Sequence, residues 1–114
     1  MKGFGNNNNS KKRKKYQLQN NNKDDQIINQ AIDYQSKGNI AKASKLYEFL
    51  IEKGCKKSII LVNYGIILLN KGRLKDAKII FQQAIELNPK DAILHTNFGV
   101  ILKDLGKLKE AELY

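Results

Sequence analysis

The sequence predicts an all-α fold, a solenoid of antiparallel helix pairs. Identical residues recur at intervals of 34 positions, and between them apolar residues follow a helical spacing of three or four. No stretch shows the apolar–polar alternation that is typical of a half-buried strand. The recurring residues are Gly38, Gly72 and Gly106; Ala43, Ala77 and Ala111; and Asn29, Asn63 and Asn97.

This constant interval divides most of the chain into repeated units. Residues 24–57 are the first unit, residues 58–91 the second and residues 92–114 a partial third, about two and two-thirds units in all. A unit of this size cannot bury its apolar face alone, so each unit is expected to pack against the next.

Residues 1–23 differ in composition from the repeats. They carry seven basic side chains and no acidic one, which is +7 of the formal net charge of +10. This basic arm is rich in Asn and Lys and has too little apolar surface to offset the entropy of ordering, so we predict that it is disordered. Its five-residue cationic run is either a solvated tail or a weak site for a polyanion such as nucleic acid. The run is Lys11, Lys12, Arg13, Lys14 and Lys15.

Each complete unit is expected to hold two helices. In the first unit, Asp24 and Asp25 favour a helix start, because carboxylates oppose the positive end of the helix dipole. In the second unit, Ser58 is placed to cap the first helix and Gly72 to end it. Pro89 then stops the second helix, and Asp91 can cap the helix that follows. The two apolar stripes of this unit are Leu61, Tyr64, Gly65 and Leu68, then Leu74, Ala77, Lys78, Phe81, Ala84 and Ile85.

The third unit ends in mid-repeat. Gly106 predicts a break there, which leaves a short last helix from about Lys107 to Tyr114, below the roughly 12–15 residues that an isolated helix needs. The open end is expected to leave apolar residues partly uncovered. The chain is then the N-terminal part of a longer repeat protein, a homodimer through that end, or marginally stable. The uncovered residues are Leu102, Leu105, Leu108, Leu113 and Tyr114.

Small and large residues alternate along the predicted interfaces. Ala31, Gly65 and Gly99 stand where the two helices of a pair would cross closely, and the alanines at 43, 77 and 111 do the same on the second helices. Tyr47 and Phe81 then fill the space toward the next unit. Such alternation lets stacked helices interdigitate at native packing density.

These residues resemble the tetratricopeptide repeat, a helix–turn–helix unit with large and small side chains at fixed offsets, whose period equals the interval seen here. The resemblance covers residues 24–114, and the first unit departs from the pattern at Gln30 and Cys55. The second unit matches at Leu61, Tyr64, Gly65, Leu68, Gly72, Ala77, Phe81, Ala84 and Pro89. The third matches at His95, Phe98, Gly99, Leu102, Gly106 and Ala111, and the first at Ile27, Ala31, Tyr34, Gly38, Ala43, Tyr47 and Leu50.

The resemblance implies a right-handed superhelix whose first helices line a concave groove. Family members mostly bind peptides or helices of other proteins in that groove and are seldom catalysts. By the family pattern, the groove uses the second, fifth, sixth, ninth, twelfth and thirteenth positions of each unit. The residues that we single out there are Ile28, Asn29, Ile32, Val62, Asn63, Ile66, Thr96, Asn97 and Val100.

These nine residues form an apolar strip beside a row of amides. An asparagine amide both donates and accepts hydrogen bonds. The three asparagines therefore either bind the backbone of an extended partner segment or form hydrogen bonds with neighbouring helices. Some family members clamp a C-terminal carboxylate with cations, but here only Asn63 matches that clamp. An apolar or amphipathic segment of a partner protein therefore fits better.

Catalytic and metal chemistry are not expected from this sequence. His95 is the only histidine and Cys55 the only cysteine, too few for a zinc site or a disulfide framework. His95 is interpreted as structural and Cys55 as a plain loop thiol, with weak activation by neighbouring lysines left open. No cofactor is expected. The alternatives to a binding scaffold are a polyanion-binding protein and a fragment of a longer protein whose catalytic part lies elsewhere.

Neither a secretory signal nor a transmembrane helix is expected. The residues after Met1 lack an apolar h-region. The longest apolar stretch, residues 59–69, is interrupted by Asn63 and is shorter than the roughly 20 residues that span a bilayer. We therefore expect a cytoplasmic protein.

Overall fold

The computed structural model describes residues 22–113 and the side chains of residues 22–109. The predictions about the basic arm, including the run from Lys11 to Lys15, lie outside these residues. Asn22 and Lys23 are already helical, so the predicted boundary at residue 24 is slightly late. Helix ends are the part of a helix that sequence specifies least sharply.

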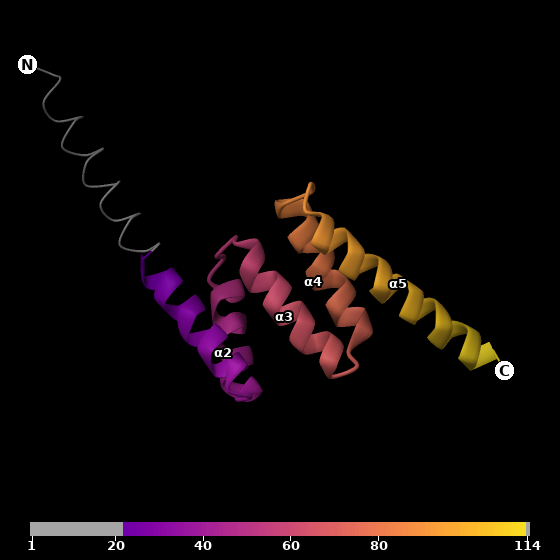
Figure 1. The fold of residues 1–114 in the computed structure, drawn as a ribbon, viewed down its shortest axis with the longest axis horizontal. Helices are drawn as coiled ribbons and strands as arrows, with labels where there is room; N and C mark the ends of the chain where they lie inside the picture. The colour runs from indigo at the N-terminus through magenta and orange to yellow at the C-terminus, as the bar shows by residue number, and fades with distance from the viewer. Residues whose placement is uncertain (1–21, 114) are drawn as a thin grey trace, which may run out of the picture.

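The described residues form five helices and no strand, which confirms the predicted all-α class. Successive helices run in alternating directions and pack side by side, as expected for a solenoid of helix pairs (Figure 1). Helix 22–36 pairs with α2, α3 pairs with α4, and α5 follows at the end of the stack. The labelled helices are α2 (Ile40–Glu52), α3 (Ser58–Asn70), α4 (Leu74–Leu87) and α5 (Ala92–Leu113).

Glycines end the first helix of each complete pair. Gly38 and Gly72 adopt φ values of 82° and 75°, a left-handed conformation in which other residues are strained. Asp91 caps α5 as predicted, because its carboxylate accepts the backbone N–H of Ile93 at 2.9 Å. The prediction for Ser58 was wrong: this residue is the first of α3, and the N-cap is Lys57, which makes no side-chain capping bond.

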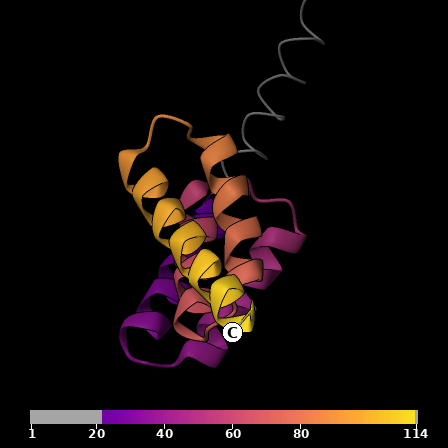
Figure 2. The same cartoon turned by 90° about the vertical axis from the view of Figure 1, so that its right-hand side faces the viewer.

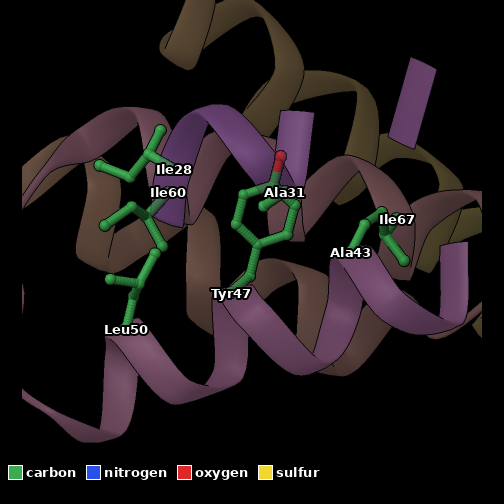
Figure 3. Packing of buried hydrophobic residues seen from close by; sticks show 7 residues of the cluster. All are labelled: Ile28, Ala31, Ala43, Tyr47, Leu50, Ile60 and Ile67. Atoms are coloured by element: carbon green, nitrogen blue, oxygen red, sulfur yellow. The ribbon is translucent and has the colours of Figure 1, made fainter. Parts of the chain in front are cut away.

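Two apolar clusters form the core. In the first, the Tyr47 side chain reaches from α2 toward Ala31 on helix 22–36, with Leu50, Ile28 and Ile60 packed at one end (Figure 3). The Tyr47 hydroxyl donates to Gln35 Oε1 at 2.7 Å, which satisfies the polar tip of a fully buried ring. The second cluster lies between α3, α4 and α5 and consists of Leu61, Leu68, Ala77, Phe81, Ala84, Leu94 and Ile101.

The closest packing occurs between Gly65 on α3 and the ring of Phe81 on α4. A Cβ atom added to Gly65 would lie 2.5 Å from the nearest ring carbon, well inside van der Waals contact. Phe81 is fully buried, so the ring has no free space into which to move. This contact confirms that Gly65 marks a close helix crossing. The Phe81 ring, expected to fill the space toward the next unit, packs against Gly65 of its own unit and also shares a cluster with Leu94 and Ile101 of α5.

Gly99 on α5 occupies the equivalent position in the third unit but has open space above it. A Cβ atom added there would meet nothing within 4 Å. The reason is that α5 continues through Gly106 instead of turning, so no described helix returns over Gly99.

The predicted break at Gly106 was therefore wrong. Gly106 does not adopt a positive φ, and α5 runs without interruption to Leu113. In the first two units the returning helix is anchored by an aromatic residue nine positions after the glycine, Tyr47 or Phe81. Within the described residues no aromatic side chain packs over Gly99 in this way. A glycine permits a turn without requiring one.

Gly65→Ala and Gly99→Ala form a matched pair that tests the close crossing. The Gly65 variant should lose about 1–3 kcal/mol of unfolding free energy, because its methyl group displaces the Phe81 ring. The Gly99 variant should gain up to about 1 kcal/mol from the higher helix propensity of alanine. Urea unfolding followed by circular dichroism measures both. Equal effects of the two substitutions would contradict the packing described.

Two ion pairs fasten helix 22–36 to the segment that connects α2 to α3. Lys53 Nζ lies 2.6 Å from Asp24 Oδ1, and Lys57 pairs with Asp25. The Asp24 carboxylate is nearly buried, and the hydrogen bond from Lys53 lowers its pKa below the ordinary value. The two acids expected to favour the helix start thus also hold the first helix of this unit against the connection at the unit's end.

The lowered pKa of Asp24 predicts a loss of stability in acid. A carboxylate with a lower pKa in the folded state stabilises the fold above its unfolded pKa of about 3.9, and this contribution disappears as the pH falls through the folded pKa. Asp24→Asn should therefore lower the free energy of unfolding by about 1 kcal/mol at neutral pH and by almost nothing in strong acid.

Urea unfolding at several pH values measures this difference. Asp33→Asn is the control, since Asp33 pairs with Lys37 on the exposed surface of one helix and should contribute less than about 0.5 kcal/mol. A difference between wild type and Asp24→Asn that does not change with pH would rule out the ion pair as its source.

Candidate functional site

The nine predicted groove residues lie on three helices that run in the same direction, namely helix 22–36, α3 and α5 (Figure 1). These are the first helices of the three units. The α3 sequence is apolar on nearly all sides, unlike the amphipathic α2 and α4. A helix of this kind is covered by neighbours on most of its surface, and the apolar residues left over are available for contact.

The exposed apolar surface of these helices is concentrated at the second and ninth positions of the units. Val100 is 51% exposed, while Ile32, Val62 and Ile66 are half-buried. Thr96 on α5 is exposed and adds a small polar side chain. Half-buried aliphatic side chains can lose further water when a partner covers them, which is the source of apolar binding energy.

Ile59 and Ile93 were not among the predicted residues, although both belong to the implied surface. They occupy the second position of successive units and are 46% and 70% exposed. The repeat could have identified them, because Ile59 and Ile93 occupy equivalent positions in successive units, as Ile66 and Val100 do. Their exposure extends the apolar strip toward the N-terminal ends of α3 and α5.

Ile28 lies in the core instead of on the surface. It is 5% exposed and belongs to the cluster around Tyr47, Leu50 and Ile60. The repeat pattern gives Ile28 the same position as Val62, but Ile60 and Leu50 cover it when the units stack (Figure 3). The first unit therefore presents Ile32 without Ile28.

The three asparagines are not equally exposed. Asn29 is exposed, whereas Asn63 and Asn97 are half-buried. The Asn63 amide lies near the Tyr47 hydroxyl: burial raises the pKa of Tyr47, and the hydrogen bond with Asn63 partly offsets that rise. Asn63 therefore faces a neighbouring helix with part of its side chain, while Asn29 is free to meet a partner.

His95 bonds to the loop that precedes α5. Its Nε2 lies 2.6 Å from the carbonyl oxygen of Pro89. Since a carbonyl only accepts hydrogen bonds, Nε2 carries the proton in this contact. The contact holds the turn between α4 and α5, a structural role.

Cys55 is half-buried in the connection between α2 and α3. Burial and the nearby carboxylate of Asp24 raise the pKa of its thiol, and the smaller effects of Lys57 and Lys53 do not reverse the shift. A raised pKa lowers the thiolate fraction, so the activation by neighbouring lysines that the sequence left open is absent.

Two cavities among the described residues lie away from the nine predicted residues. One, of about 320 Å³, lies beside Cys55 and is lined partly by Ile51, Leu61 and Leu87. Another, of about 450 Å³, lies between α4 and α5. Within the described residues, no three His, Cys, Asp or Glu side chains gather as a metal site, and every helix falls short of what crossing a bilayer requires.

Comparison with known families gives two matches. Two family models, each described as Tetratricopeptide repeat, match residues 58–91 and residues 80–112. The first range runs from the start of α3 to the residue before α5, a complete helix pair. Comparison with curated proteins gives no match.

Proposed function

We propose that this chain, which carries tetratricopeptide repeats in residues 58–112, is a non-catalytic scaffold that binds a segment of another protein along helix 22–36, α3 and α5. The observation that carries the proposal is the exposed apolar strip on these helices. Single exposed apolar residues are normal on a protein surface, but residues that recur on one face point to an interaction site. Ile59, Ile93 and Val100 are the exposed members of the strip.

The chemistry of the strip favours an apolar or amphipathic partner segment. The residues that face outward are aliphatic, and the polar groups beside them are the Asn29 amide and the Thr96 hydroxyl, which carry no charge. A partner side chain buried against aliphatic residues contributes about 1.5–3 kcal/mol, and the polar groups fix its register. None of the nine residues has a cationic side chain that could pair with the C-terminal carboxylate of a partner.

Substitution of the two most exposed residues of the strip tests the proposal. Short peptides, selected from a displayed library on the full chain, should bind the double variant Ile93→Asp plus Val100→Asp at least tenfold more weakly. Both side chains are more than half exposed, so the fold should be retained. Fluorescence anisotropy gives the affinities, and circular dichroism confirms the helix content.

Leu102→Asp is the matched control. Leu102 is also exposed on α5, at 44%, but lies about 200° around the helix from Val100. Selected peptides should bind this variant within twofold of the wild type. Peptides that bind Ile93→Asp plus Val100→Asp as tightly as the wild type would show that the strip is not the binding surface.

A further inference from the structure

A pocket lies on the side of α3 that faces away from the strip of the proposed function. It has a volume of about 320 Å³, and the ends of α2 and α4 form it together with the connection between α2 and α3. Figure 2 shows this connection and α4 on the same side of the stack. Leu61, the α3 residue of the pocket, lies about 200° around the helix from Ile59 of the strip. Residues of both complete units line the pocket, so it lies inside the stack.

The floor of the pocket is apolar. Leu61 is 6% exposed and Ile51 is half-buried, while Leu87 at the edge is 42% exposed. Gly54 in the connection adopts a φ of 87°, which favours glycine, and a Cβ atom added there would meet nothing within 4 Å. An aliphatic stem can therefore enter beside Gly54 and cover Leu61 and Leu87.

The carboxyl ends of two helices make the pocket electrically negative. Residues near the ends of α2 and α4 line it, and neither helix has a basic residue in its last turn. Each carboxyl end acts as about half a negative charge. Glu86 adds a full charge and forms no ion pair with any residue that the structure describes. Lys56 is the cation among the lining residues, and it offsets only part of this charge.

The end of α4 also has hydrogen-bond acceptors to spare. At the end of α2, the N–H groups of residues 53–55 bond back to helix carbonyls. After α4, Pro89 has no N–H to offer, and within the described residues no backbone N–H bonds to the carbonyls of Ile85, Glu86 or Leu87. Carbonyl and carboxylate oxygens only accept hydrogen bonds. The α4 side of the pocket therefore favours a positively charged donor.

An arginine side chain combines the two properties that the pocket favours. Its methylene stem can cover Leu61 and Leu87, and its guanidinium can donate to Glu86 and to the neighbouring carbonyls. An anion would instead meet Glu86 and two helix carboxyl ends, with Lys56 as its one counterion in the lining. We propose that this pocket binds an arginine of a partner protein, whose segment places an apolar neighbour of that arginine on Leu87.

A short peptide is the probe. Acetylated and amidated Ser-Leu-Arg-Leu-Ser, titrated onto the ¹⁵N-labelled full chain, should shift the NMR signals of the Gly54 and Cys55 amides along a saturable curve. The same peptide with uncharged citrulline in place of arginine should bind about fivefold more weakly. Saturating arginine peptide should also slow the alkylation of Cys55, the only cysteine in the chain, since Cys55 lines the pocket.

Variants of the full chain locate the binding, and all of the substituted side chains near the pocket are exposed. Glu86→Gln should weaken the arginine peptide about fivefold, and Leu87→Ser about threefold. Lys56→Gln should tighten binding about twofold, because it removes a like charge. Glu52→Gln is the matched control: Glu52 occupies the position of Glu86 one unit earlier, does not line the pocket, and should leave the affinity within about twofold.

The double variant Ile93→Asp plus Val100→Asp separates this inference from the proposed function. It removes the strip on the other side of the first helices, so the arginine peptide should bind it within about twofold of the wild type.

Several results would overturn the inference. These are unshifted Gly54 and Cys55 signals, equal binding of the arginine and citrulline peptides, equal binding to wild type and Glu86→Gln, or weaker binding to Lys56→Gln. A full-length chain with residues 11–15 replaced by serine could also bind the peptide about tenfold more tightly than the wild type. That result would show that the chain's own basic arm, and not a partner, occupies the pocket.

Discussion

The contact between the Phe81 ring and Gly65 is the interaction on which the arrangement of the other helices depends. It brings α3 and α4 close enough for Leu61, Leu68 and Ala84 to share one cluster. In the first unit the Tyr47 ring packs with Ala31 in one cluster, and the Tyr47 hydroxyl also donates a hydrogen bond to Gln35. An aromatic side chain on the second helix and a small residue on the first thus define each pair. Because the Phe81 ring is fully buried, the thickness of this ring, and not the turn between the helices, sets the distance between α3 and α4.

The third unit differs from the first two within the described residues. No described aromatic residue lies over Gly99, and α5 continues through Gly106 as one helix of 22 residues. The side of α5 that carries Ile93 and Val100 belongs to the surface proposed to bind a partner segment.

The helix class and most helix ends could be predicted from the sequence because these depend on local chemistry. Glycine at 38 and 72 reverses the chain, Pro89 stops α4, and Asp91 caps α5. The same reasoning failed at Gly106, where the residue type is identical but α5 continues without a turn. Local propensity states what a residue permits, and buried contacts decide whether the chain uses it.

Features that depend on how the helices pack, or on the residue at which a helix begins, could not be predicted in this way. The pair of Asp24 with Lys53 joins residues 29 positions apart and follows from the placement of helix 22–36 beside the α2–α3 connection. Ile28 looked like a surface residue because the repeat pattern gives it the position of Val62, yet the next unit covers it. Ser58 lost its predicted capping role because α3 already begins at this residue.

Amide hydrogen exchange along the full chain tests most directly whether buried aromatic contacts determine the order of the helices. Amides that open only on global unfolding should cluster in α3 and α4, on either side of the Phe81 ring. Along α5, protection should fall steadily beyond Ile101, since no described helix covers that part. Exchange in residues 103–109 as slow as in residues 65–69 would contradict this account, because it would mean that α5 is stable without the contact that holds the other pairs.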